Sequence, residues 1–133
     1  AVLLHDPKGG EARFDWLHSD TLIEDARGRL LARDRFQVTG AQLARGLPGV
    51  TGNWKAQAGF YVVAERAERL LPAMREALSG TGVYGGVSLL PNQSGAWARM
   101  LAVDAAALKS ALFAAWSAAR ETLTGSAPMP RRK

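Results

Sequence analysis

The chain of 133 residues contains no cysteine and only two histidines, His5 and His18. Without cysteine, disulfide bridges, thiol nucleophiles and thiolate metal sites are all excluded. The two histidines lie far apart in the sequence, with no HxH or HxxxH spacing and no cluster of carboxylates around either. Isolated histidines of this kind are typical of surface or hydrogen-bonding residues rather than metal ligands.

Long apolar runs are also missing. No stretch approaches the roughly 18 residues that a membrane helix needs, so we expect no membrane partner. The first residue is Ala1 and no basic-then-apolar segment follows it, which predicts a chain without a secretion signal. With the absence of cysteine, this favours a cytoplasmic protein. The missing initiator Met suggests a trimmed or partial product.

Charge of one sign is not concentrated anywhere except at the end of the chain. The formal net charge is +5, but the basic residues are spread out and the only pure basic run is 131–133. A nucleic-acid-binding protein needs a basic patch or a recognisable fold, so we expect no nucleic-acid partner. Hydrophobic content of 47% and charged content of 22% are ordinary for one globular domain, which we place at residues 1–133.

Alternation of apolar and polar residues is clearest over 29–38. Leu30, Ala32, Phe36 and Val38 share one face, while arginines and Gln37 occupy the other. This pattern predicts a half-buried antiparallel strand, and Gly28 predicts a hairpin turn that joins it to an extended segment over 14–24. Asp34 falls on the apolar face, so we expect it to pair with an arginine or to reach the sheet edge.

The remaining segments divide into strands, then helices. We expect a short helix or loop at 41–44, and a helix over 66–78 in which Pro72 opens the final part or causes a kink. Gly80 and Gly82 end that helix. The other predicted strands are 2–5, 60–63, 83–90 and 96–103.

The last helix has strong end signals, with Asp104 as its N-cap and Gly125 just past its end. Helical spacing predicts that the face packed on the core carries Leu108, Leu112, Ala115, Trp116, Ala119 and Leu123. The order of elements predicts a mainly β, antiparallel fold, a sandwich-like stack of strands with two α-helices in the C-terminal region.

Residues that could carry chemistry are few. Glu24 and Asp25 are adjacent at a turn, where acids commonly cap backbone groups, and adjacent strand residues point to opposite faces. Gly85 and Gly86 lie inside a strand, where glycine indicates a bulge or a close neighbour. No phosphate-binding glycine spacing and no GxSxG around Ser88 or Ser94 is present. The four tryptophans, Trp16, Trp54, Trp97 and Trp116, are better explained as core or interface anchors than as a base-stacking platform. We therefore predict no catalytic residues, and a binding or scaffold protein rather than an enzyme.

Several short motifs occur in the order found in one known family. They are Gly28-Arg29-Leu30-Leu31-Ala32-Arg33-Asp34-Arg35, Phe60-Tyr61-Val62-Val63, Ser88-Leu89-Leu90-Pro91 followed by Arg99-Met100-Leu101, Trp116 with Arg120, and Pro130-Arg131. Together they resemble the C-terminal half of the urease accessory proteins of the UreD family, also called UreH. The resemblance reaches back to Gly10-Glu11 at most.

The resemblance implies a non-catalytic, mostly β protein with a β-helix-like stack of strands. It implies binding to apo-urease and to UreF, which recruits the GTPase UreG carrying nickel. It also implies an internal passage for nickel, lined by weak, replaceable oxygen ligands, with no cofactor of the protein's own. Glu11, Glu24 and Asp34 are the candidate carboxylates for such a passage, and the sequence does not choose among them, so the metal-site residues stay unknown.

Two other interpretations remain open. One is a generic β/α protein-interaction domain, whose basic tail and arginine-rich strand face bind an acidic partner or nucleic acid. The other is an enzyme in which Asp34 works with a second carboxylate that the sequence does not identify.

Overall fold

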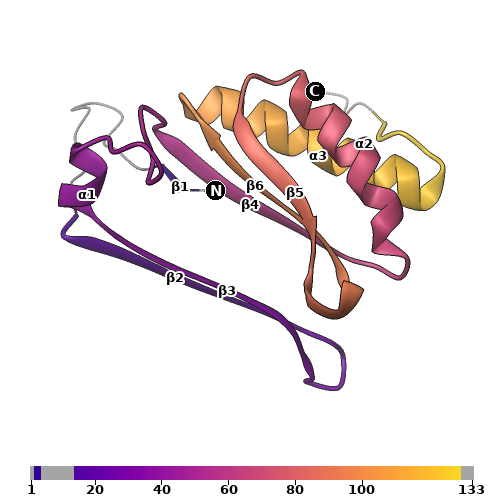
Figure 1. Cartoon of the computed structure of the whole chain (residues 1–133). Helices are drawn as coiled ribbons and strands as arrows, with labels where there is room; N and C mark the ends of the chain where they lie inside the picture. The colour runs from indigo at the N-terminus through magenta and orange to yellow at the C-terminus, as the bar shows by residue number, and fades with distance from the viewer. Residues whose placement is uncertain (1, 4–13, 130–133) are drawn as a thin grey trace.

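The computed structural model describes residues 2–3 and 14–129, which form a hairpin, a four-stranded sheet and two long helices in successive layers (Figure 1). The strands are β1 (Val2–Leu3), β2 (Trp16–Glu24), β3 (Leu30–Thr39), β4 (Ala56–Val63), β5 (Tyr84–Leu89) and β6 (Gly95–Ala102). The helices are α1 (Gly40–Ala44), α2 (Leu70–Ser79) and α3 (Ala105–Thr124), with short 3₁₀ turns at Ala67–Arg69 and Pro91–Gln93. The antiparallel, strand-rich fold class with two helices near the C-terminus is thus confirmed.

The first layer is the hairpin of β2 and β3, whose alternation was readable in the sequence. Gly28 has φ +76° in its turn, as the hairpin prediction requires. Ala32 and Val38 point inward and are buried, whereas Leu30 is 51% exposed and the prediction that it shares their buried face is wrong. The pairing register shifts between Ile23 and Glu24, beside Leu30, which lies next to the turn of the hairpin.

The second layer is the sheet, in the order β1-β4-β6-β5 with every pairing antiparallel. β4 begins four residues before the predicted strand over 60–63, because its alternating small residues Ala56 and Ala58 carry a weak β signal although both are buried. β5 and β6 form the predicted second hairpin. Of the predicted strand over 2–5, the structure describes Val2 and Leu3, and His5 lies outside the described residues.

The third layer is α2 and α3, which cover one face of the sheet (Figure 1). Pro72 lies in the first turn of α2, where its missing N–H would have no helical partner, so it opens the helix without a kink. Asp104 accepts a hydrogen bond from the backbone N–H of Ala107, and Gly125 ends α3 at φ +71°. Both predicted caps of the last helix are confirmed.

The core lies between the helices and the sheet. Leu70, Met74 and Met100 are its largest fully buried side chains. Around them are small residues from the sheet and from α3, among them Ala96, Ala98, Ala111, Ala115 and Ala119.

The predicted inner face of α3 needs correction. Leu108, Ala115 and Ala119 are buried and Leu112 packs partly against the core, but Trp116 is 41% and Leu123 42% exposed. α3 lies close to α2 and to β4 and β6, and alanine allows that close approach where tryptophan does not. The alanine face therefore turns inward, and two of the bulky residues assigned to the core turn outward.

Candidate functional site

The second face of the sheet, turned away from the helices, carries a stacked aromatic pair and an arginine. Strand alternation places Tyr61 of β4 and Trp97 and Arg99 of β6 on this face, opposite the buried alanines. Tyr61 and Trp97 are direct cross-strand partners, and their rings stack with centroids 6.1 Å apart. The Arg99 guanidinium lies 4.9 Å from the centroid of the Trp97 ring, within cation–π range.

Asp34 of β3 reaches this group from the hairpin. Its Oδ2 accepts a hydrogen bond of 2.6 Å from the Tyr61 hydroxyl, and its Oδ1 lies 2.5 Å from Nη2 of Arg99. The sequence left open whether Asp34 pairs with an arginine or reaches an edge, and the structure selects the arginine. These contacts join the hairpin to the sheet.

The electrostatics of the group follow from its half-buried position. Burial opposes ionisation of Asp34, but the hydrogen bonds from Arg99 and Tyr61 outweigh it and hold the pKa of Asp34 below 3.8. Burial and the neighbouring Asp34 carboxylate raise the pKa of Tyr61 to about 12. At neutral pH the group is therefore an ionised carboxylate, a guanidinium and a neutral phenol.

Two glycines are the cross-strand partners of Arg99. In the register of the sheet, Arg99 lies between Gly59 of β4 and Gly86 of β5. A Cβ added at Gly86 would meet nothing within 4 Å, so this side of Arg99 is open. The neighbouring Gly85 points to the other face, where a Cβ would lie 2.7 Å from the carbonyl oxygen of Arg99. The close-neighbour interpretation of this glycine pair is therefore confirmed at Gly85 and not at Gly86.

Two hollows lie between the hairpin and the sheet, one on each side of the Asp34–Arg99 pair. The first, of about 370 Å³, is lined by Ala32, Arg33, Asp34, Tyr61, Leu89, Leu90, Pro91 and Trp97. The second, of about 350 Å³, is lined by Phe36, Gln37, Val38, Gln42, Leu43, Gly49, Val50, Thr51, Gln57, Arg99 and Leu101. Amide and hydroxyl groups thus line the second hollow, beside Arg99.

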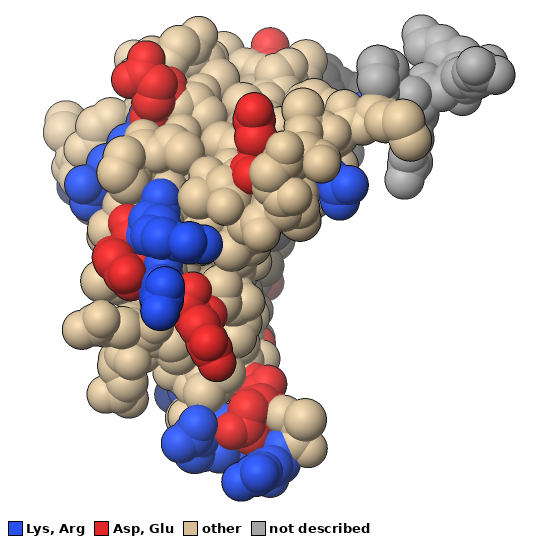
Figure 2. All heavy atoms as spheres, turned by 90° about the vertical axis from the view of Figure 1, so that its right-hand side faces the viewer, with Lys and Arg blue, Asp and Glu red and all other residues tan. Residues whose placement is uncertain are grey.

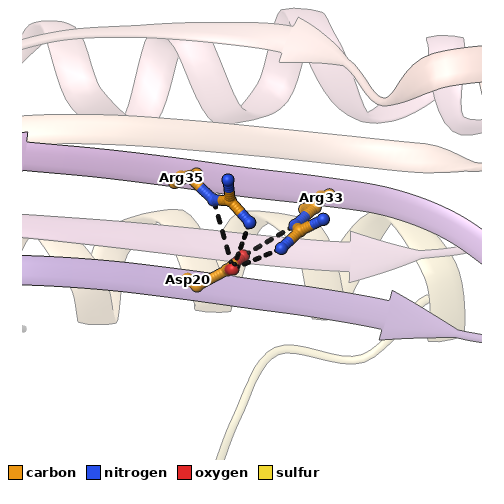
Figure 3. Close-up of polar contacts among 3 residues, drawn as sticks. All are labelled: Asp20, Arg33 and Arg35. Atoms are coloured by element: carbon orange, nitrogen blue, oxygen red, sulfur yellow. Dashed lines mark hydrogen bonds and ion pairs between the residues drawn. The ribbon is translucent and has the colours of Figure 1, made fainter.

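The opposite, outward face of the hairpin carries a second charged group (Figure 3). Asp20 of β2 lies between Arg33 and Arg35 of β3 and accepts hydrogen bonds from both guanidinium groups. The arginine-rich strand face seen in the sequence is thus partly neutralised by a carboxylate. Figure 2 shows that basic and acidic side chains are also mixed on another face of the molecule. These arrangements do not form a single basic field of the kind that nucleic acids bind.

The other candidate residues do not join the Asp34 group. Glu24 is exposed near the hairpin turn, and Asp25 accepts hydrogen bonds there from the backbone N–H groups of Arg27 and Arg29. Those backbone bonds lower the pKa of Asp25 below 3.8, as expected for an acid that caps a turn. His18 is exposed on the outward face of β2, and Glu11 lies outside the described residues.

Within residues 2–3 and 14–129, no three His, Asp or Glu side chains come close enough together to hold a metal ion. None of the helices there has the length and apolar character needed to cross a membrane.

Asp34 stands out in the sequence, but its partners Tyr61 and Arg99 do not. Tyr61 and Arg99 lie 27 and 65 residues from Asp34 in the chain, so no local pattern connects them. The available signal was an acid on an otherwise apolar strand face, which requires a partner when it is half-buried.

Comparison with known proteins places the whole chain in one group. A family described as "UreD urease accessory protein" matches residues 1–133, so the expectation that the similarity begins at Gly10-Glu11 is wrong. Two relatives, each named urease accessory protein UreD 1, come from Pseudomonas syringae pv. syringae and pv. tomato, and each is 43% identical over the full chain. A third UreD 1, from Methylorubrum populi, is 34% identical. The chain covers 48% of the two Pseudomonas relatives and 46% of the Methylorubrum one, so it spans about half their length.

Proposed function

The chain belongs to the UreD family of urease accessory proteins, and from this premise we propose that it scaffolds UreF and UreG on apo-urease and helps to deliver nickel during urease maturation. The family is one of accessory proteins, so the chain is not an enzyme. The small number of candidate catalytic residues in the sequence predicted this. The observation that carries the proposal is the family match over residues 1–133, supported by 43% identity along the full chain.

Nickel is the cargo in this proposal, and the chain has no cofactor of its own. A transit route favours oxygen ligands that bind weakly and exchange, and amide, hydroxyl and carboxylate oxygens supply them without cysteine. The hollows beside Asp34 offer such groups, including Gln42, Thr51 and Gln57. Of the two candidate carboxylates in the described residues, Glu24 and Asp34, Asp34 lines this space.

Asp34 is not a free ligand in this state, because Arg99 and Tyr61 already occupy its oxygens. A nickel ion that used this carboxylate would have to displace the Arg99 guanidinium. We therefore propose that Asp34 contributes to transient passage rather than to a resident nickel site.

The test is a pull-down of this chain with UreF and, separately, with apo-urease. The full-length relative from Pseudomonas syringae pv. syringae serves as the positive control, since the chain covers 48% of it. Capture of either partner by the chain would support the proposal and would assign a partner surface to this half of the family. Capture by the control and none by the chain would reject scaffolding by this chain and favour the generic interaction domain.

A further inference from the structure

The outward face of α3 carries a continuous line of exposed side chains. Lys109, Phe113, Trp116, Arg120 and Leu123 follow one another at spacings of four, three, four and three residues. This spacing is that of the a and d positions of a heptad, which form a single seam along a helix. We call these five residues the α3 seam.

The seam is apolar over much of its length although it faces away from the core. Phe113 is 60%, Trp116 41% and Leu123 42% exposed. The rings of Phe113 and Trp116 are in contact, with centroids 5.6 Å apart. Single exposed apolar residues are common on monomeric proteins, but a contiguous aromatic pair in a heptad line is typical of a binding surface.

The α3 seam is exposed because another side of α3 packs against the core. Ala111, Ala115 and Ala119 are buried there, where α3 lies close to α2 and the sheet. Since the small residues allow this close approach, the larger ones are left on the outside. In the described part of the chain, Phe113, Trp116 and Leu123 remain 41–60% exposed.

The seam contains two cations, Lys109 and Arg120. In residues 2–3 and 14–129, neither Lys109 nor Arg120 takes part in an ion pair. No acidic residue belongs to the seam, and Glu121 lies about a third of a turn away on the helix surface. The α3 seam therefore has an aromatic pair, Phe113 and Trp116, with a positive charge on each side of it.

We propose that the α3 seam binds an amphipathic helix of a partner protein, in which apolar residues recur at heptad spacing and are flanked by Asp or Glu. Helices that lie along an apolar groove are recognised through anchors at this spacing. Acidic flanks complement Lys109 and Arg120 and set the direction of the bound helix. This inference adds a binding surface to the proposed function. It rests on the proposed function only for the statement that the partner takes part in urease maturation.

A second copy of the chain fits the seam less well. Two paired seams would bring four cations, Lys109 and Arg120 from each copy, into one interface without a carboxylate from either seam. Like charges at an interface suppress such pairing. The chemistry of the seam therefore favours an acidic partner over self-association.

The first experiment uses a labelled synthetic helix as the probe, so it does not depend on the urease system. Its sequence has three heptads with Leu at a and d and Glu beside them, and a matched peptide replaces every Glu with Lys. We expect the chain to bind the Glu peptide at least about tenfold more tightly than the Lys peptide, measured by fluorescence anisotropy.

Three variants locate the binding surface. Phe113→Glu/Trp116→Glu should abolish binding, and Lys109→Glu/Arg120→Glu should reverse the preference between the peptides. Ser110→Glu places a similar charge on an exposed position of α3 outside the seam and should leave binding nearly unchanged. Thermal unfolding followed by circular dichroism verifies that each variant is folded. Equal binding of both peptides, binding of neither, or binding unaffected by Phe113→Glu/Trp116→Glu would overturn the inference.

The second experiment repeats the pull-down with UreF and apo-urease, using the same variants. Partner capture that the seam variants retain would overturn the inference and leave the proposed function standing. Seam-dependent peptide binding without capture of either partner would support the inference and overturn the proposed function. Sedimentation of the chain alone tests whether a second copy binds the seam. A dimer that Phe113→Glu/Trp116→Glu converts to a monomer would show that the seam binds a second copy, and would overturn the inference.

Discussion

Asp34 of β3 and Arg99 of β6 form an ion pair that connects the hairpin to the four-stranded sheet, with 2.5 Å between Oδ1 and Nη2. The Tyr61 hydroxyl donates to the second oxygen of the same carboxylate. A two-stranded hairpin is marginally stable by itself, so its attachment to the sheet matters for the whole fold.

Replacing Asp34 with Asn should lower the free energy of unfolding by about 1.5–3 kcal/mol, because hydrogen bonds to a charged group contribute this much. Urea-induced unfolding measures the change. Asp20→Asn is the matched control, since Asp20 also pairs with arginines but lies on the exposed outer face of the same hairpin. Exposed pairs contribute about 0–1 kcal/mol, so the control should change less. Equal losses in the two variants would show that the Asp34 contacts have no special role.

The contribution of Asp34 should also depend on pH. Its pKa in the folded protein lies below 3.8, since the hydrogen bonds from Arg99 and Tyr61 outweigh the effect of burial. The unfolded chain therefore binds the proton more tightly, and the stabilisation is present above about pH 4 and is lost as the pH falls further. The stability difference between the parent chain and Asp34→Asn should shrink below about pH 4. A difference that stays constant down to the acid transition would contradict this assignment.

Tyr61 provides the corresponding test at alkaline pH. Burial and Asp34 raise its pKa to about 12 in the folded protein. The folded state thus holds the phenolic proton more tightly than the unfolded chain, and stability should fall as the pH rises from about 10 towards 12. Tyr84→Phe removes the signal of the other tyrosine, so the ultraviolet absorbance of the phenolate reports Tyr61 alone. Adding Asp34→Asn should lower the pKa of Tyr61, and an unchanged titration would show that Asp34 does not influence it.

Two adjacent glycines in β5 should respond differently to alanine. A Cβ at Gly85 would lie 2.7 Å from the carbonyl oxygen of Arg99, so Gly85→Ala forces the backbone to shift. We expect a loss of about 1–3 kcal/mol, the usual cost of overpacking. Gly86→Ala meets nothing within 4 Å and should change stability by less than about 0.5 kcal/mol. The two urea midpoints check the prediction, and similar values would place the close contact elsewhere.

Local signals in the sequence predicted the elements more successfully than their packing. Alternation around Ala32 and a turn at Gly28 identified the first hairpin, and Asp104 and Gly125 marked the ends of α3, because each signal acts within a few residues. Asp34 was recognisable as an anomaly. Its partner Arg99 was not, since contacts across 65 residues leave no local pattern.

The inward face of α3 was missed for a different reason. Hydropathy favoured the bulky residues, whereas close packing against α2 and the sheet selects the smallest side chains. Ala111 and Ala115 are buried, and Trp116 is exposed. Where two helices approach closely, residue size decides the face more strongly than hydrophobicity does.

This correction yields a final prediction from two positions in the same helix. Leu112 packs partly against the core, whereas Trp116 is 41% exposed. Aspartate in place of Leu112 would bring a charge to the edge of the core, and we expect it to cost about 2–4 kcal/mol. The same replacement of Trp116 costs less helix propensity, because Trp and Asp rank together, and the side chain is more exposed than Leu112, so we expect a smaller loss of about 1–2 kcal/mol. Thermal and urea unfolding of the two variants measure the difference. If Trp116→Asp destabilised the fold as much as Leu112→Asp, Trp116 would belong to the core and the outward seam on α3 would not exist.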